Sequence, residues 1–300
     1  MWKLIFILAL FLECSTHASV FELLQPIAEA SLTCGPITFI DSYTESLDCS
    51  LKDVKSSNIE VAVTSSDVDM AGFISRENFV NIDITGDDKY PEYFPKHLAK
   101  TLKGTTTFTY TKTPLKVIKR DDLTDFGTKL YILSLADNKI EDIAYDALHG
   151  LTKLRNLILS NNKLKSLPSN LLSNAPIFDS LFINSNELTE LHPDLFKDSP
   201  LFNFLSAEFN KIDKIDKDLF KNNINLSIVL MKYNKIRNIP INFTRFELLD
   251  SVDFTHNGGS CDTMFFSFEP YEEQYDAIEK KKWIKRLPEF QKKIEDVCRG

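Results

Sequence analysis

One asparagine recurs along this chain at a nearly constant interval and in the same setting. Four successive spacings are 24 residues and the last is 23, for the positions Asn138, Asn162, Asn186, Asn210, Asn234 and Asn257. Apolar residues hold fixed places around each one in the frame LxxLxLxxNxL, as Leu133, Leu135 and Ile140 do around Asn138. Self-similarity at a period of about 20 to 50 residues indicates a repeat architecture, in which each unit buries its core only against its neighbours.

Each repeat predicts one short strand and one turn. The apolar pair at period two places two side chains toward the core and the residues between them outward. The asparagine amide has donors and an acceptor, so at a turn it can satisfy backbone groups, and stacked copies form a ladder. A second core row follows at a fixed offset in helix-tolerant sequence: Leu148, Leu171, Leu195, Leu219 and Phe243. The fold class is therefore expected to be an α/β repeat, a solenoid of stacked coils.

The pattern also divides the chain into segments. We expect a signal peptide at 1–18, an N-terminal cap region at 19–78, a solenoid at 79–260 and a helical C-terminal cap at 261–300. The repeats are regular from about residue 105, where a coil without the asparagine begins, and a weaker copy starts near Phe79. Terminal units of a repeat array are atypical because they must close its ends.

The first residues are typical of a secretory signal. Trp2 and Lys3 precede the apolar run from Leu4 to Leu12, and small residues follow at 16–19. The run is too short to span a membrane. We therefore expect a secreted, extracellular protein without a membrane span.

Four of the five cysteines lie after the expected signal peptide: Cys34, Cys49, Cys261 and Cys298. An even set in an oxidising compartment favours disulfides. Four cysteines allow three connectivities. Because one pair lies near each end of the chain, local pairing of Cys34 with Cys49 and of Cys261 with Cys298 is favoured.

The tail from residue 261 carries an apolar stripe at helical spacing, interrupted by Pro288: Trp283, Leu287, Phe290, Ile294 and Val297. Such a stripe is typical of a face packed on a core. The interpretation that we favour is a helical cap over the last coil, and the alternative is a short coiled coil that dimerises.

Charge and motifs exclude several classes of function. A net charge of −8 disfavours a nucleic-acid partner. The chain contains no HExxH, CxxC, GxSxG, phosphate-loop or dinucleotide fingerprint, so no catalytic residue, metal site or cofactor is expected. The DFG triplet at 125–127 has no other kinase signature beside it, and Asp67, Asp69 and Gly72 lack the spacing of a calcium loop.

With LxxLxLxxNxL at a 24-residue period, residues 105 to 261 resemble the extracellular leucine-rich-repeat family, in its typical subclass. The lone Cys261 after the last asparagine and the tail ending in Cys298 resemble the secreted repeat proteins of flies and midges. A vertebrate-type C-terminal cap has four clustered cysteines, and this tail has two. The resemblance implies a curved solenoid (a horseshoe) with parallel strands on its concave face. It also implies that this face binds proteins, glycans or lipids, without specifying the ligand.

Outward-facing positions of four neighbouring coils gather large apolar side chains, which we predict to be a ligand-binding patch: Ile158, Phe182, Phe204, Phe209, Ile228, Leu230 and Tyr233. Exposed apolar patches on soluble proteins usually mark interfaces. Two other interpretations stay open, namely that some rings turn into the core and that the chain's own tail covers the patch.

Two sequons predict glycosylation at Asn225, before Leu226 and Ser227, and at Asn242, before Phe243 and Thr244. Asn242 shares its coil position with polar residues and is expected to be exposed.

The function that we expect is a secreted recognition module, in innate immunity or cell-surface recognition, and not an enzyme. One alternative is a structural or matrix protein that self-associates through its C-terminal helix. Another is an enzyme inhibitor that wraps around its target. The pattern gives neither the ligand nor the oligomeric state.

Overall fold

The computed structural model describes residues 79–257, except residues 96, 97 and 103. Outside that range it describes the backbone of five strands. These are β1 (Ala30–Cys34), β2 (Thr38–Phe39), β3 (Thr44–Lys52), β4 (Val61–Thr64) and β15 (Phe265–Ser267). The expected signal peptide, the helical stripe at 283–297, Cys261 and Cys298 lie outside the described residues.

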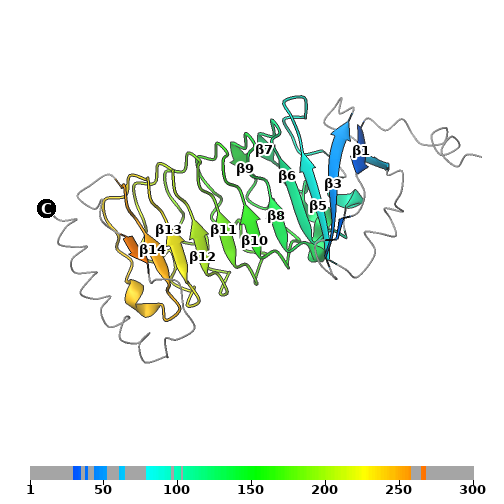
Figure 1. Cartoon of the computed structure of the whole chain (residues 1–300). Coiled ribbons are helices and arrows are strands. Elements are labelled where there is room, and N and C mark those ends of the chain that lie inside the picture. Colours follow the sequence, from blue (N-terminus) through cyan, green and yellow to red (C-terminus); the bar gives the residue numbers. More distant parts are fainter. Residues whose placement is uncertain are drawn as a thin grey trace, which may run out of the picture.

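The described chain winds into stacked coils, each contributing one strand to a long sheet (Figure 1). Two strands precede the asparagine repeats, β5 (Phe79–Thr85) and β6 (Thr107–Thr111). Six strands follow in chain order: β8 (Ile132–Ser134), β10 (Asn156–Ile158), β11 (Ser180–Phe182), β12 (Phe204–Ser206), β13 (Ile228–Leu230) and β14 (Ser251–Asp253). Neighbours from β3 to β14 pair in parallel, so the described chain forms a solenoid of stacked parallel strands.

The sheet continues beyond these coils at both ends. At one end β1 pairs antiparallel with β3, and the register places Cys34 opposite Cys49. Residues directly opposite in an antiparallel pair have Cα atoms about 4.5 to 5.5 Å apart, which is within the reach of a disulfide. At the other end β15 pairs antiparallel with β14. The segment expected to be a helical cap therefore begins with a strand.

Two rows of apolar side chains fill the inside of the coils. The strand row includes Leu133, Leu157, Leu181, Leu205 and Val229, all at most 1% exposed. The row from the return segments, which includes Leu148, Leu171, Leu195 and Leu219, is at most 4% exposed. Phenylalanine rings join adjacent coils, with Phe196 stacked on Phe202 at 4.0 Å between centroids. One continuous core thus runs through the whole described solenoid.

The repeated asparagines lie at the carboxyl ends of the strands and bind the backbone of two coils. Asn186 shows the pattern: its Nδ2 donates to the carbonyls of Leu159 and Ile183, and its Oδ1 accepts from the amide of Leu164. Asn257 makes the equivalent bonds in the last coil. In the coil without an asparagine, Thr113 takes its place, and the Thr113 hydroxyl donates to Oδ1 of Asn138. Buried backbone groups at every corner are thereby satisfied.

The return segments are turns, which corrects the expectation of an α/β repeat. In the described residues the helices are α4 (Leu98–Thr101), η1 (Thr124–Lys129) and η2 (Phe243–Arg245). Elsewhere, amides such as those of Leu171 and Leu195 donate to carbonyls three residues earlier, which is the pattern of turns and not of an α-helix. A helix must extend over several turns to offset the cost of nucleation, and these return segments are too short for that.

A small second sheet, β7 (Val117–Ile118) with β9 (Asp142–Ile143), links two return segments. No helix in the described residues is both long and apolar enough to cross a membrane.

Candidate ligand-binding surface

The outward side chains of strands β8 to β14 form what we call the strand face. Ile158, Phe182, Phe204, Ile228 and Leu230 all lie on it and are half-buried. The rings of Phe182 and Phe204, on adjacent strands, contact each other with centroids 4.8 Å apart. The structure therefore brings these five predicted patch residues together on neighbouring strands, and their side chains do not enter the core.

The residue before each ladder asparagine lies at the corner where the strand ends, and we call this set the corner row. Each member has a left-handed backbone with φ between 53° and 58°: Asp137, Asn161, Ser185, Phe209, Tyr233 and His256. Asparagine and aspartate tolerate this conformation because their short polar side chains bond locally, whereas a bulky side chain there is unusual. Asp137 and Asn161 follow this preference, Ser185 is also small and polar, and Phe209 and Tyr233 depart from the preference.

The last three members of the corner row form an aromatic stack on the surface. The rings of Phe209 and Tyr233 lie 4.5 Å apart at 12°, and those of Tyr233 and His256 lie 4.3 Å apart at 20°. Phe209 is 51% exposed and Tyr233 is 41% exposed. Stacked rings with open edges present a rigid apolar ridge with two polar tips, the Tyr233 hydroxyl and the His256 imidazole.

Polar groups surround the apolar part of the strand face. Ser160 and Ser206 both donate to Oδ1 of Asn184, at 2.6 and 3.2 Å, and Ser206 also contacts Glu208. Asp253 is 6% exposed, and its Oδ1 accepts from the amide and hydroxyl of Thr255. These side chains already bond to one another, so the strand face combines a preformed polar network with an apolar strip.

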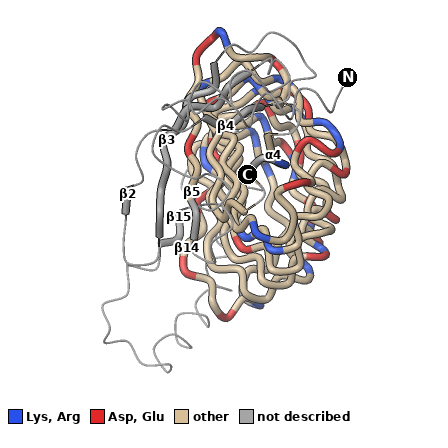
Figure 2. The backbone as a smooth tube through the Cα atoms, turned by 90° about the vertical axis from the view of Figure 1, so that its right-hand side faces the viewer, with Lys and Arg blue, Asp and Glu red and all other residues tan. Residues whose placement is uncertain are grey.

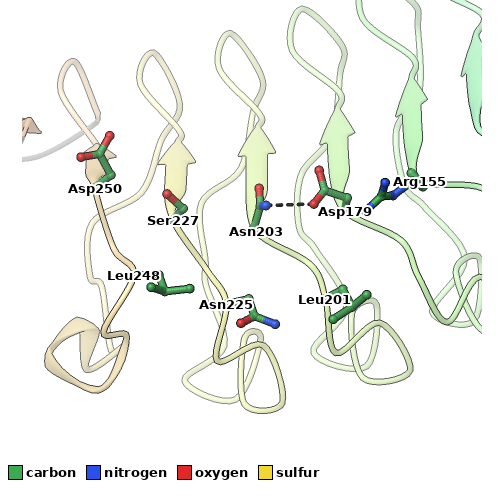
Figure 3. Close-up of a pocket in the computed structure, with 8 residues that line it drawn as sticks. All are labelled: Arg155, Asp179, Leu201, Asn203, Asn225, Ser227, Leu248 and Asp250. Carbon is green, nitrogen blue, oxygen red and sulfur yellow. Dashed lines mark hydrogen bonds between the residues drawn. The ribbon is translucent and has the colours of Figure 1, made fainter. Parts of the chain in front are cut away.

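A groove of about 570 Å³ lies along the base of the last strands, at the edge of the sheet opposite the corner row (Figure 3). Its polar wall is the first residue before each strand: Arg155, Asp179, Asn203, Ser227 and Asp250. Its other wall, on the preceding loops, consists of Leu201, Asn225 and Leu248. Both leucines are exposed, at 42% and 48%. The Nδ2 of Asn203 donates to Asp179 at 2.8 Å across adjacent coils.

The predicted sequons lie at different places in the coil. Asn225 lines the groove, and its Nδ2 donates to the carbonyl of Pro200 at 3.1 Å. Asn242 is exposed beside η2 on the return side.

Acid and base groups of the described residues do not gather into a reactive cluster. No group of three or more His, Cys, Asp or Glu residues is placed there to hold a metal ion. Burial raises the pKa of the Tyr110 hydroxyl far above its usual range, so this core phenol stays neutral. Lys, Arg, Asp and Glu are interspersed along the described coils (Figure 2). The surface that stands out is therefore apolar and aromatic.

Two features, the groove and the aromatic stack, were not predicted from the sequence pattern. The residues that line the groove recur at fixed positions of the coil, as Asp179, Asn203 and Ser227 do, but the repeat frame does not indicate that a groove lies along them. The stack had a visible signal, since Phe209, Tyr233 and His256 directly precede the ladder asparagines of the last three coils, but the predicted patch does not include His256. The ring contact became evident once the corner geometry was known.

A family model described as "Leucine rich repeat" matches residues 115–164 and 128–188. None of the curated proteins matches the chain. A solved structure titled "Crystal structure of TLR13-ssRNA13 complex" is similar to it at 18% sequence identity and a TM-score of 0.42. That similarity covers 59% of this chain and 28% of that chain, so the present chain spans less than a third of its length.

Proposed function

We propose that this chain, a member of the leucine-rich-repeat family by its matched repeats, is a secreted recognition protein that binds a protein ligand. The ligand contacts the apolar strip of the strand face and the aromatic stack of the corner row. Innate immunity and cell-surface recognition are the processes that such a protein would serve.

The observation that carries the proposal is the stack of Phe209, Tyr233 and His256. A left-handed backbone costs an ordinary residue about 1 to 2 kcal/mol. The corners at Asp137, Asn161 and Ser185 avoid much of this penalty with short polar residues, while Phe209 and Tyr233 accept it and remain exposed. Strained positions that persist on a surface are typical of functional sites. The retained property is an aromatic ridge, and aromatic side chains are enriched at the centres of protein interfaces.

The composition of the strand face favours a protein over a polyanion. Large apolar side chains of β10 to β13 lie next to neutral hydroxyl and amide groups, and Glu208 and Lys232, of opposite charge, occupy the same position in neighbouring coils. Nucleic-acid binding depends on clustered Lys and Arg that neutralise phosphates. Together with the net charge of −8, this favours a ligand that buries apolar surface.

We infer that the chain binds a ligand and does not catalyse a reaction. Among the described residues, carboxylates such as those of Asp253 and Asp146 are bonded to neighbouring groups of the chain itself. Asp253 caps the turn at Thr255, and Asp146 pairs with Arg120 at 2.9 Å. A catalytic pair would need a carboxylate or imidazole free to exchange protons with a substrate in a cleft.

The proposal is tested by replacing Phe182, Phe204 and Tyr233 together with Ser. The full chain, tagged and expressed through a secretory pathway, captures ligand from the extracellular fluid of the source organism by chemical crosslinking, and mass spectrometry identifies the ligand. We expect the triple variant to lose the captured protein at least tenfold, because truncating central aromatic contacts costs about 2 kcal/mol or more each. Urea unfolding of the variant establishes that the coils still fold.

The matched control is Tyr145→Ser, which removes a 60% exposed ring from the return side and should leave capture unchanged. Equal capture by the triple variant and the wild type would contradict binding at this surface. A tighter association with single-stranded RNA than with any protein would refute the choice of ligand class. Self-association of the wild type in light scattering, with no captured protein, would favour the matrix alternative.

A further inference from the structure

The groove at the strand bases has a composition that the strand-face ligand does not explain. It lies where the strands begin (Figure 3), whereas the corner row lies where they end. Two exposed leucines, Leu201 and Leu248, form one side of it, and hydrogen-bonding side chains at the strand bases form the other. Neighbouring exposed apolar side chains that are rimmed by polar groups are typical of surfaces that bind or are covered by another group.

The occupant is indicated by Asn225, which lies between the two leucines on the same wall of the groove (Figure 3). Asn225 begins the sequon whose hydroxyl residue, Ser227, lies on the opposite polar wall. Both essential residues of this acceptor motif therefore line one groove. A sugar attached at Asn225 would start inside it.

The bonding of Asn225 is compatible with attachment. Its Nδ2 donates one hydrogen bond, to the carbonyl of Pro200 at 3.1 Å. A side-chain amide has two N–H donors, and N-glycosylation replaces one hydrogen with the sugar. The remaining hydrogen can keep the bond to Pro200, so the modified side chain needs no new orientation.

We propose that Asn225 carries an N-linked glycan and that its first sugars lie along this groove. The apolar C–H faces of the sugars cover Leu201 and Leu248, and their hydroxyls pair with Asn203, Ser227 and Asp250. The groove is thus a cradle for the chain's own glycan, leaving the strand face open for the protein ligand. The inference rests on the secretion included in the proposed function, because the sugar is added only in the secretory pathway.

The test uses two variants at one position, expressed as the full chain in a secretory host. Ser227→Ala removes the sequon and keeps Asn225, whereas Ser227→Thr keeps the sequon. Peptide mass spectrometry should show a glycan at Asn225 in the wild type and in Ser227→Thr, and none in Ser227→Ala. Hydroxyl-radical footprinting then measures side-chain accessibility. We expect oxidation of Leu201 and Leu248 to rise several-fold in Ser227→Ala relative to Ser227→Thr, with Tyr145 oxidised equally in both.

Trimming the wild-type glycan to its first sugar leaves the Asn225 amide intact and should raise leucine oxidation part of the way. A bare Asn225 in secreted protein would overturn the proposal, and so would a modified Asn225 with unchanged leucine oxidation. These failures are separable from failure of the proposed function. Protein retained in the cell with both sequons bare refutes the secretion as well. A glycan at Asn242 beside a bare Asn225 refutes only the cradle and leaves capture by the strand face unaffected.

Discussion

The first three asparagine coils and the last three share one backbone but differ in what they present. Ladder bonds, corner φ angles and core rows are the same from β8 to β14. The corner row changes from Asp137, Asn161 and Ser185 to Phe209, Tyr233 and His256, whereas large apolar side chains lie on the strand face of both halves. The repeat therefore fixes the path of the chain without fixing its surface. Side chains that the local backbone disfavours, such as Phe209 and Tyr233 at left-handed corners, are therefore candidates for functional residues.

The first prediction concerns what the two halves share. Asn186→Ala and Asn234→Ala should each lower the free energy of unfolding by about 3 to 5 kcal/mol, because each leaves one buried amide and two buried carbonyls without their partner. Urea unfolding of both variants measures the loss. Exposed Asn174→Ala on a return segment is the control and should change stability by less than about 0.5 kcal/mol. Losses that differ between the halves by more than about 2 kcal/mol would contradict a common backbone.

The second prediction concerns the corner row, whose residue types differ between the first three and the last three asparagine coils. Asn161→Phe places a bulky ring in a left-handed corner and removes the bond from Asn161 to Asp137, so it should destabilise by about 1 to 2 kcal/mol. The reverse change, Phe209→Asn, relieves the corner but loses a stacked pair, worth about 0.5 to 1.5 kcal/mol. Its net effect on stability should therefore stay within about 1 kcal/mol.

The same pair of variants separates stability from binding. Phe209→Asn should reduce ligand capture although the protein is as stable as the wild type, whereas Asn161→Phe should leave capture intact. A Phe209→Asn variant with full capture would show that the ridge is not the contact surface. A large loss of stability in that variant would indicate that the stack is structural.

How much of this could be expected from the sequence follows from the same contrast. Positions set by the repeat could be predicted, because a period-two apolar pair and a recurring asparagine can each be accommodated in only one way in a stacked coil. The match to leucine-rich repeats and the stacked parallel strands confirm that solenoid. The turns of the return segments could not be predicted, since helix-tolerant sequence such as that around Leu171 forms turns when the coil is too short for a helix. The groove could not be predicted either, because its walls combine side chains from several stacked coils, such as Leu201, Asn225 and Leu248.

The smallest predicted effect lies at the boundary between the halves, where Lys211 of one coil donates to Glu187 of the coil before it at 2.8 Å. The hydrogen bond from Lys211 is the main cause that lowers the pKa of Glu187 below its usual value of 4.5. A carboxyl whose pKa is depressed in the folded state stabilises the fold at pH values above its unfolded pKa, and this contribution is lost as the pH falls through the folded pKa.

Glu187→Gln should therefore unfold at a slightly lower urea concentration than the wild type at pH 7. The two midpoints should converge as the pH falls below 4.5. Both groups are exposed, so added salt should also narrow the gap at pH 7. Urea midpoints across pH 3 to 7, measured beside Glu190→Gln as the control of equal charge change, would show it. A gap that persists in acid would mean that Glu187 joins the two halves through packing of its stem and not through its charge.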